Sequence, residues 1–270
     1  MKESILLAAS LFMASAVLPM GIKGLKKLGL NKKNYQGKSL PAFGGLIPII
    51  IFLMIFLLMN FLSEAKSFFL VFIFFSLTML GLIDDFFGKG REKGFKGHFK
   101  AVLKGKITTG MLKAVGISVL ALISAWYFSK KELFFLNLFL NAGLIALASN
   151  FINLLDLRPG RAVKTFLAFG FIINLAFRQG EVLWFYILSG TFIAYLPWDL
   201  KEKAMLGDTG ANVLGFALGL LMTNFLGLPL KIIVIFVLFI LHLYAESISF
   251  SKVIEENRYL RYLDLLGRLR

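Results

Sequence analysis

Long blocks of apolar residues, separated by short polar segments, dominate this sequence and restrict it to few architectures. A helix needs about twenty predominantly apolar residues to cross the hydrocarbon of a bilayer. Nine segments approach that length, so we predict an all-α, polytopic membrane helix bundle of about nine transmembrane helices. The predicted spans are residues 4–20, 43–62, 67–83, 108–128, 133–151, 162–177, 182–196, 210–225 and 229–250.

The composition agrees with a single membrane-embedded domain covering residues 1–270. Apolar residues make up 58% of the chain, which includes 30 Phe, whereas soluble domains average about 45–50%. The spans leave little sequence for a separate soluble domain. The first apolar segment lacks a basic start and a clear cleavage site, so we interpret it as a retained first span rather than a signal peptide.

The net charge of +15 is concentrated in alternate loops and predicts the topology. Lys and Arg cluster in loops 21–42, 84–107, 152–164 and 197–209 and in the tail 251–270, while the loops between them are short and nearly neutral. The positive-inside rule places the basic set in the cytoplasm, with the N-terminus outside and the C-terminus inside. Because the basic residues lie between apolar spans, we do not predict a nucleic-acid-binding protein.

The tail also has an amphipathic pattern. Leu260, Leu263 and Leu266 lie on one face of a predicted helix, with arginines on the other. Such a helix could lie on the lipid headgroups, and an ordinary stop-transfer tail is the alternative.

Cysteine and histidine are scarce, which excludes several kinds of site. The chain has no Cys and two His, His98 and His242. Disulfides, zinc–thiolate sites, thiol nucleophiles and a three-histidine metal site within one chain are therefore excluded.

Four aspartates are the strongest candidates for chemistry. Asp84, Asp85, Asp156 and Asp208 all lie at predicted cytoplasmic ends of spans, where ionisable residues are costly and usually functional. We expect them to converge. Because adjacent carboxylates repel, a divalent cation or lysines must relieve the charge, and an all-oxygen ligand set suits Mg²⁺ or Mn²⁺. For a single aspartate at an interface, a helix N-cap is the alternative interpretation.

Glycines and basic residues beside these acids are candidates to bind phosphate. Gly44-Gly45 and the Gly207–Gly210 segment begin predicted helices, where free backbone N–H groups can face an anion. Basic side chains that could hold a diphosphate are Lys38, Lys100, Lys104, Arg158 and Arg161. A purely topological role is the alternative for each of the lysines.

In order along the chain, these segments resemble the polyprenyl-phosphate N-acetylhexosamine-1-phosphate transferase family. Residues 41–45 are similar to its Pro-Thr-Met-Gly-Gly loop, and residues 81–85 to its double-aspartate motif. Residues 150–156 resemble its Asn-x-x-Asn-Leu-x-Asp motif, and residues 205–210 its Met-Gly-Asp-Thr-Gly motif. The Asp-Asp pair alone is unspecific, but the ordered set of four is specific and covers most of the chain.

The resemblance implies an activity and a role for each motif. It implies transfer of a sugar-1-phosphate from a UDP-activated amino sugar to polyprenyl phosphate, with Mg²⁺ bound by Asp208. Asp84 and Asp85 would lie at the reaction centre, and Asn153 and Asp156 match polar residues of the nucleotide-side cleft. Together with the candidates drawn from the residues themselves, the predicted catalytic residues are Asp84, Asp85 and Asp156. The predicted substrate-binding residues are Lys38, Gly44, Gly45, Lys100, Lys104, Asn150, Asn153, Arg158 and Arg161. The implied location is a bacterial cytoplasmic (inner) membrane, with the active site facing the cytoplasm.

The sequence also departs from the family pattern. Residues 157–162 read Leu-Arg-Pro-Gly-Arg-Ala where the family usually has Gly-Leu-Asp-Gly-Leu-Ala, and the histidine cluster of the last cytoplasmic loop is missing. The missing cluster favours a small donor such as UDP-GlcNAc, with lipid I synthesis from UDP-MurNAc-pentapeptide as the alternative. A transporter or flippase and an inactive family member are the alternatives of another class. The oligomeric state is left open, with a homodimer among the alternatives.

Overall fold

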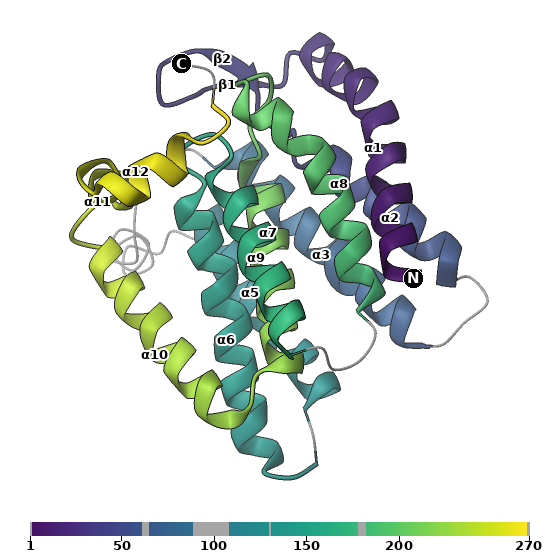
Figure 1. The fold of residues 1–270 in the computed structure, drawn as a ribbon, viewed down its shortest axis with the longest axis vertical. Helices are drawn as coiled ribbons and strands as arrows, with labels where there is room; N and C mark the ends of the chain where they lie inside the picture. Colours follow the sequence, from purple (N-terminus) through teal and green to yellow (C-terminus); the bar gives the residue numbers. More distant parts are fainter. Residues whose placement is uncertain (1, 61–64, 89–107, 130, 178–181, 269–270) are drawn as a thin grey trace.

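The structure is a computed structural model that describes residues 2–60, 65–88, 108–129, 131–177 and 182–268, and its fold is a bundle of long helices (Figure 1). The helices are α1 (Lys2–Lys27), α2 (Leu46–Asn60), α3 (Ala65–Phe87), α5 (Thr109–Phe128), α6 (Phe134–Leu155), α7 (Arg161–Phe177), α8 (Leu183–Leu200), α9 (Gly207–Phe225), α10 (Leu228–Ala245), α11 (Phe250–Glu256) and α12 (Arg258–Leu265).

Each of the nine predicted spans coincides with one of the helices from α1 to α10. Among the described residues, five helices are long and apolar enough to cross a membrane: α1, α3, α5, α6 and α10. A shorter apolar helix covers residues 46–59. The all-α membrane bundle is therefore confirmed, while the number of spans and their orientation stay predictions.

Helix α9 lies at the centre of the bundle and is buried from Thr209 to Thr223. It packs against α3, α6 and α7. Small residues permit the close approach of α6: a Cβ added at Gly215 would lie 2.6 Å from the carbonyl oxygen of Ala148, and one at Gly219 would lie 2.6 Å from Cα of Ile145. Glycines four residues apart are a common means of bringing two membrane helices into contact.

The outer surface of the bundle is apolar, as expected of a surface in contact with lipid. Helix α10 buries only Lys231 and Leu238, and leaves large apolar side chains such as Phe236 and Phe239 more than half exposed. Contiguous exposed apolar surface of this extent is rare in soluble monomers, so it supports the assignment of α10 as a membrane span.

One departure from the all-α prediction is a small hairpin in the first basic loop. Strands β1 (Asn31–Lys33) and β2 (Ser39–Pro41) pair antiparallel, and the side chain of Asn34 accepts hydrogen bonds from the backbone of Gln36 and Lys38 within the turn. Asn is favoured in such turns because its side chain mimics a backbone acceptor. The hairpin lies at the same end of the bundle as α11, α12 and the described C-terminus, at the top of Figure 1.

Candidate active site

The four predicted aspartates converge at one end of the bundle. Asp84 and Asp85 are in the last turn of α3, Asp156 directly follows α6, and Asp208 is in the first turn of α9. Because α9 packs against both α3 and α6, these helix ends meet around the start of α9. The aspartates therefore share one site, although the chain separates the first from the last by 124 positions.

A lysine joins two of these carboxylates. The ammonium nitrogen of Lys113, near the start of α5, lies 2.6 Å from Asp84 Oδ2 and 3.1 Å from Asp208 Oδ2. The two carboxylates are also within hydrogen-bonding reach of each other. Asp208 is the most open of the three, with a side chain 30% exposed, against 11% for Asp84 and 13% for Lys113. A ligand arriving from solvent would therefore meet Asp208 first.

Asp85 holds the start of α9. Its Oδ2 accepts hydrogen bonds from the backbone nitrogen of Thr209 at 2.9 Å and from the Thr209 hydroxyl at 2.8 Å, and its Oδ1 lies 3.5 Å from Nζ of Lys32. The first N–H groups of a helix lack partners within the helix, and a carboxylate there also interacts favourably with the helix dipole. Asp85 is thus placed to fix the Gly207–Thr209 turn, whereas Asp84 pairs with Lys113.

Asp156 approaches the same turn from α6. Its carboxylate accepts a hydrogen bond from the backbone N–H of Gly207. Burial and the nearby charges of Asp199, Asp208 and Asp85 raise the pKa of Asp156 well above its usual value, although the Gly207 contact acts in the opposite direction. A carboxyl with a strongly raised pKa beside other acids is typical of functional sites.

Replacing Asp156 by asparagine should make the protein more stable above neutral pH. A folded-state pKa above the unfolded value contributes stability that is present at acid pH and is lost as the pH rises through the folded pKa. The asparagine side chain does not titrate, so the apparent unfolding temperature of the Asp156→Asn variant in detergent should exceed that of the wild type near pH 8. The difference should shrink towards pH 4. Equal unfolding temperatures at both pH values would contradict the prediction, and the exposed Glu256→Gln variant is the control.

The Pro41–Gly45 segment pairs with the residues before α9. The N–H groups of Gly44 and Gly45 donate to the carbonyls of Met205 and Leu206 at 2.9 and 3.1 Å. A Cβ at Gly45 would lie 2.6 Å from the oxygen of Leu206. The expectation that these N–H groups are free to bind phosphate is therefore corrected: both are already paired, and glycine is needed there for close packing.

The same correction applies to the start of α9. The N–H groups of Gly207 and Thr209 donate to the carboxylates of Asp156 and Asp85. They are satisfied by acidic side chains rather than held open for a phosphate.

The remaining predicted residues have different surroundings. Asn153 is partly buried and Asn150 exposed, both on the last turns of α6. Lys38 extends from the hairpin and pairs with Glu202 at 2.7 Å. Burial raises the pKa of Glu202, but the hydrogen bonds from Lys38 and Tyr35 outweigh it and bring the pKa below its usual value. Lys100 and Lys104 lie outside the described residues.

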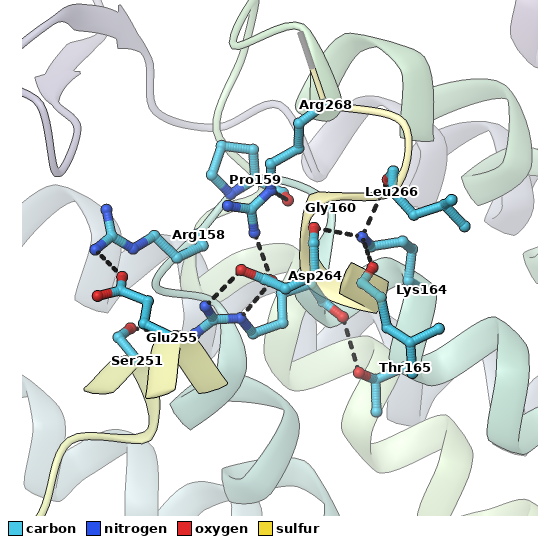
Figure 2. Close-up of polar contacts among 12 residues, drawn as sticks. Arg158, Pro159, Gly160, Lys164, Thr165, Ser251, Glu255, Asp264, Leu266 and Arg268 are labelled. Atoms are coloured by element: carbon cyan, nitrogen blue, oxygen red, sulfur yellow. Dashed lines mark hydrogen bonds and ion pairs between the residues drawn. The ribbon is translucent and has the colours of Figure 1, made fainter. Parts of the chain in front are cut away.

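The two arginines that follow Asp156 have partners in the C-terminal tail, and Figure 2 shows Arg158 beside Glu255. Arg158 lies 2.7 Å from Glu255 and stacks over the ring of Tyr35 at 4.0 Å. Arg161 is buried and makes two parallel hydrogen bonds to Asp264, at 2.9 and 3.0 Å. Because the guanidinium of Arg161 is buried and already paired, the prediction that it holds a diphosphate loses its basis.

Two residues of the site were missed by sequence reasoning. Lys113 falls inside a predicted span, where the cost of a charged side chain is itself a signal of function. Asp199, near the end of α8, is buried and accepts a hydrogen bond from the backbone N–H of Gly160 at 2.8 Å. Asp199 belongs to none of the four motifs, and an aspartate beside a basic loop does not by itself indicate a functional site.

The oxygen ligands present are suited to Mg²⁺, although they form no complete cage. In the part of the chain that the structure describes, no three His, Asp or Glu side chains gather closely enough to hold a metal by themselves. Protein Mg²⁺ sites commonly use only one or two carboxylates, completed by waters and substrate phosphates. Asp84 and Asp208 supply that number of adjacent carboxylates, so they fit the ion as part of a site that a phosphate substrate would complete.

Comparisons with known proteins agree with this arrangement. The sequence profile of glycosyl transferase family 4 matches residues 67–226, which run from α3 to the end of α9 and contain all four aspartates. A phospho-N-acetylmuramoyl-pentapeptide-transferase of Prochlorococcus marinus subsp. pastoris is 26% identical over 243 residues, covering 79% of this chain and 67% of the relative. Since the profile spans more than half of the sequence, this multi-pass membrane protein belongs to glycosyl transferase family 4.

Proposed function

We propose that the protein transfers a sugar-1-phosphate, of the N-acetylhexosamine type, from a UDP-sugar to a polyprenyl phosphate and releases UMP, as the first step of a cell-envelope glycan. The observation that carries the proposal is the cluster of Asp84, Lys113 and Asp208 at one end of an apolar bundle. There, a lipid phosphate can reach the site from the bilayer while a water-soluble nucleotide enters from the aqueous side. Family membership and the named relative support the same reaction class.

In the proposed reaction, an oxygen of the lipid phosphate attacks the β-phosphorus of the UDP-sugar. A P–O bond forms to the lipid phosphate, and the bond from the β-phosphorus to the bridging oxygen breaks, so that UMP leaves with that oxygen. A phosphate nucleophile is already anionic near neutral pH, and catalysis of this kind depends mainly on positioning and charge stabilisation. The product is a lipid diphosphate-sugar.

The residues of the cluster divide these tasks. Lys113 stabilises the charge that develops on the leaving phosphate, and Asp84 holds the ammonium group of this lysine in position. Asp85 and Asp156 hold the Gly207–Thr209 turn in place. Asp208, with Asp84, would hold Mg²⁺, which when bound neutralises charge on the donor diphosphate.

Lys38 and Arg158 are the described basic residues proposed for the donor side. Lys38 would exchange its present partner, Glu202, for a donor phosphate, and Arg158, whose guanidinium lies over the ring of Tyr35, would exchange the exposed Glu255. We further propose that the cluster faces the cytoplasm, since the described basic segments, the hairpin and the C-terminal tail, lie at this end of the bundle.

Lipid I synthesis is the second candidate, and the named relative favours it. The missing histidine cluster favours a smaller donor such as UDP-GlcNAc. Purified protein should be incubated with Mg²⁺, polyprenyl phosphate and each UDP-sugar in turn, with radiolabel followed into the lipid fraction and UMP quantified. Release of UMP that depends on the lipid supports the transferase, and the productive donor separates the two candidates. No UMP with any donor would refute the transferase and leave a transporter or flippase and an inactive family member as the alternatives.

A lysine between two carboxylates predicts how the protein responds to Mg²⁺. Lys113→Gln leaves Asp84 and Asp208 adjacent without a counter-charge, so the apparent unfolding temperature should fall by about 5 °C without divalent ions. Added Mg²⁺ should restore more of the loss in this variant than it adds to the wild type. Thermal unfolding in detergent measures this without any assay of activity, with Lys252→Gln as the control. An equal effect of Mg²⁺ on both proteins would argue against a cation site at these carboxylates.

A further inference from the structure

The C-terminal tail packs directly on the turn that follows Asp156. Asp264 of α12 is almost completely buried and receives the bidentate hydrogen bonds of Arg161 together with one from Arg268, at 2.6 Å (Figure 2). Arg161 also donates to the hydroxyl of Ser251 at 3.1 Å. A planar guanidinium fork held by a buried carboxylate fixes both distance and orientation, so the tail has one register on this turn.

Backbone groups strengthen the attachment on both sides. Nζ of Lys164 donates to the carbonyls of Leu263, Asp264 and Leu266, at 2.8, 2.8 and 3.2 Å. These carbonyls belong to the end of α12, where the helix leaves its own acceptors unused. In the other direction, Nε of Arg268 donates to the carbonyl of Pro159 at 2.9 Å. Side-chain donors thus join the two segments in both directions: Lys164 donates to carbonyls of the tail, and Arg268 of the tail donates to a carbonyl of the turn.

The opposite side of the turn contacts the candidate active site. Asp156 accepts the N–H of Gly207, and the N–H of Gly160 donates to Asp199 at 2.8 Å. Gly160 has a φ of +74°, a backbone conformation that costs little only for glycine. The turn is therefore held between the aspartate cluster on one side and the tail on the other.

The tail also forms one wall of a cavity beside Arg158. The cavity has a volume of about 370 Å³, and Tyr35, Arg158, Arg261 and Arg268 are among its lining residues. Two of these arginines come from the tail and one from the turn. Displacing the tail would therefore change both the position of Asp156 and the surroundings of a residue proposed to bind the donor.

We propose that Asp264 is a positioning residue for the donor site: through Arg161 and Arg268 it fixes the 156–161 turn, and with it Asp156 and Arg158. This inference rests on the proposed transferase function. It also gives Arg161 a role other than binding diphosphate, since its guanidinium holds the tail. A misplacement of about 1 Å can cost on the order of 100-fold in rate, so the effect of losing the contact should be measurable.

The first test separates a positioning role from general stability. Asp264→Asn keeps the size of the side chain but removes the charge that both arginines share. It should raise the KM for the UDP-sugar about 10- to 100-fold while leaving the KM for polyprenyl phosphate unchanged. Asp264→Glu keeps the charge and should recover most of the loss. Glu256→Gln, an exposed tail carboxylate whose contact with Lys252 is 3.9 Å, is the matched control and should behave as wild type.

A second measurement needs no substrate. Hydrogen exchange of the backbone amides in segment 156–164 should be faster in Asp264→Asn than in the wild type, because the turn loses its support from the tail. If the wild type releases no UMP with any donor, the transferase proposal fails, yet this measurement still decides whether Asp264 holds the turn. Should Asp264→Asn fail to fold, Arg268→Gln removes the contacts of Arg268 with Pro159 and Asp264 and leaves the Arg161–Asp264 pair intact. It should give a smaller rise in donor KM, of about 3- to 10-fold.

Three results would overturn the inference. The first is unchanged exchange in segment 156–164 of the Asp264→Asn variant. The second is faster exchange without any change in donor KM, which would make Asp264 an anchor of the tail only. The third is an equal loss of apparent affinity for the lipid and for the UDP-sugar, which is the signature of a general disturbance of the fold.

Discussion

Asp208→Asn should lower the rate of phospho-sugar transfer by about 100- to 1000-fold. Asp208 is the most open carboxylate of the cluster and shares Lys113 with Asp84. Asparagine has the same shape but cannot balance the lysine or offer a charged oxygen to Mg²⁺. The loss should fall on turnover, because charge on the leaving UMP develops only as the bond breaks. Initial rates of UMP release at saturating concentrations of both substrates measure it.

The fold should survive this change, which makes the result interpretable. Lys113 keeps Asp84 as a partner at 2.6 Å, so no buried charge is left alone. Glu132→Gln, an exposed acid beyond the far end of α5, is the control and should retain full activity. Wild-type turnover in Asp208→Asn would show that the cluster is not the reaction centre.

Gly207→Ala should destabilise the protein by about 2–4 kcal/mol and abolish transfer. Gly207 has a φ of +76°, and a Cβ there would lie 2.6 Å from the carbonyl oxygen of Ala42 and 2.9 Å from Asp85 Oδ2. The left-handed conformation alone costs about 1–2 kcal/mol for alanine. The added methyl group must also push apart two segments that hold the start of α9.

Gly143→Ala is the matched control for this change. Gly143 is in the interior of α6, and a Cβ there would meet nothing within 4 Å. Alanine at that position should be neutral or stabilise the helix by about 0.5–1 kcal/mol. Apparent unfolding temperatures and UMP release, measured together for both variants, check the comparison. Equal behaviour of the two variants would mean that the turn before Asp208 does not depend on glycine.

The sequence predicts the positions of the helices well, because each apolar block is long enough to form one. It also predicts that Asp84, Asp156 and Asp208 share an end of the bundle, since each lies at the predicted cytoplasmic end of a span. The hairpin at residues 31–41 was not predicted, because its two strands are short and polar.

Long-range partners were beyond sequence reasoning. The positions of Arg158 and Arg161 beside Asp156 suggested phosphate binding, but the Arg161–Asp264 pair joins residues 103 positions apart. Nothing local distinguishes an arginine that binds substrate from one that holds a tail. Likewise, the close contact of Gly45 with Gly210 depends on how two separate segments meet, which local glycine content does not reveal.

The burial of α9 has a consequence for how the protein is made. This helix is buried among its neighbours and rich in small residues, and it is not among the five described helices that are long and apolar enough to cross a membrane. We therefore expect α9 to become stably integrated only once earlier helices are present to receive it, during or after synthesis. Substitutions in the glycine-rich face that packs on α6 would then reduce the amount of assembled protein. This loss would appear before any catalytic defect could be measured.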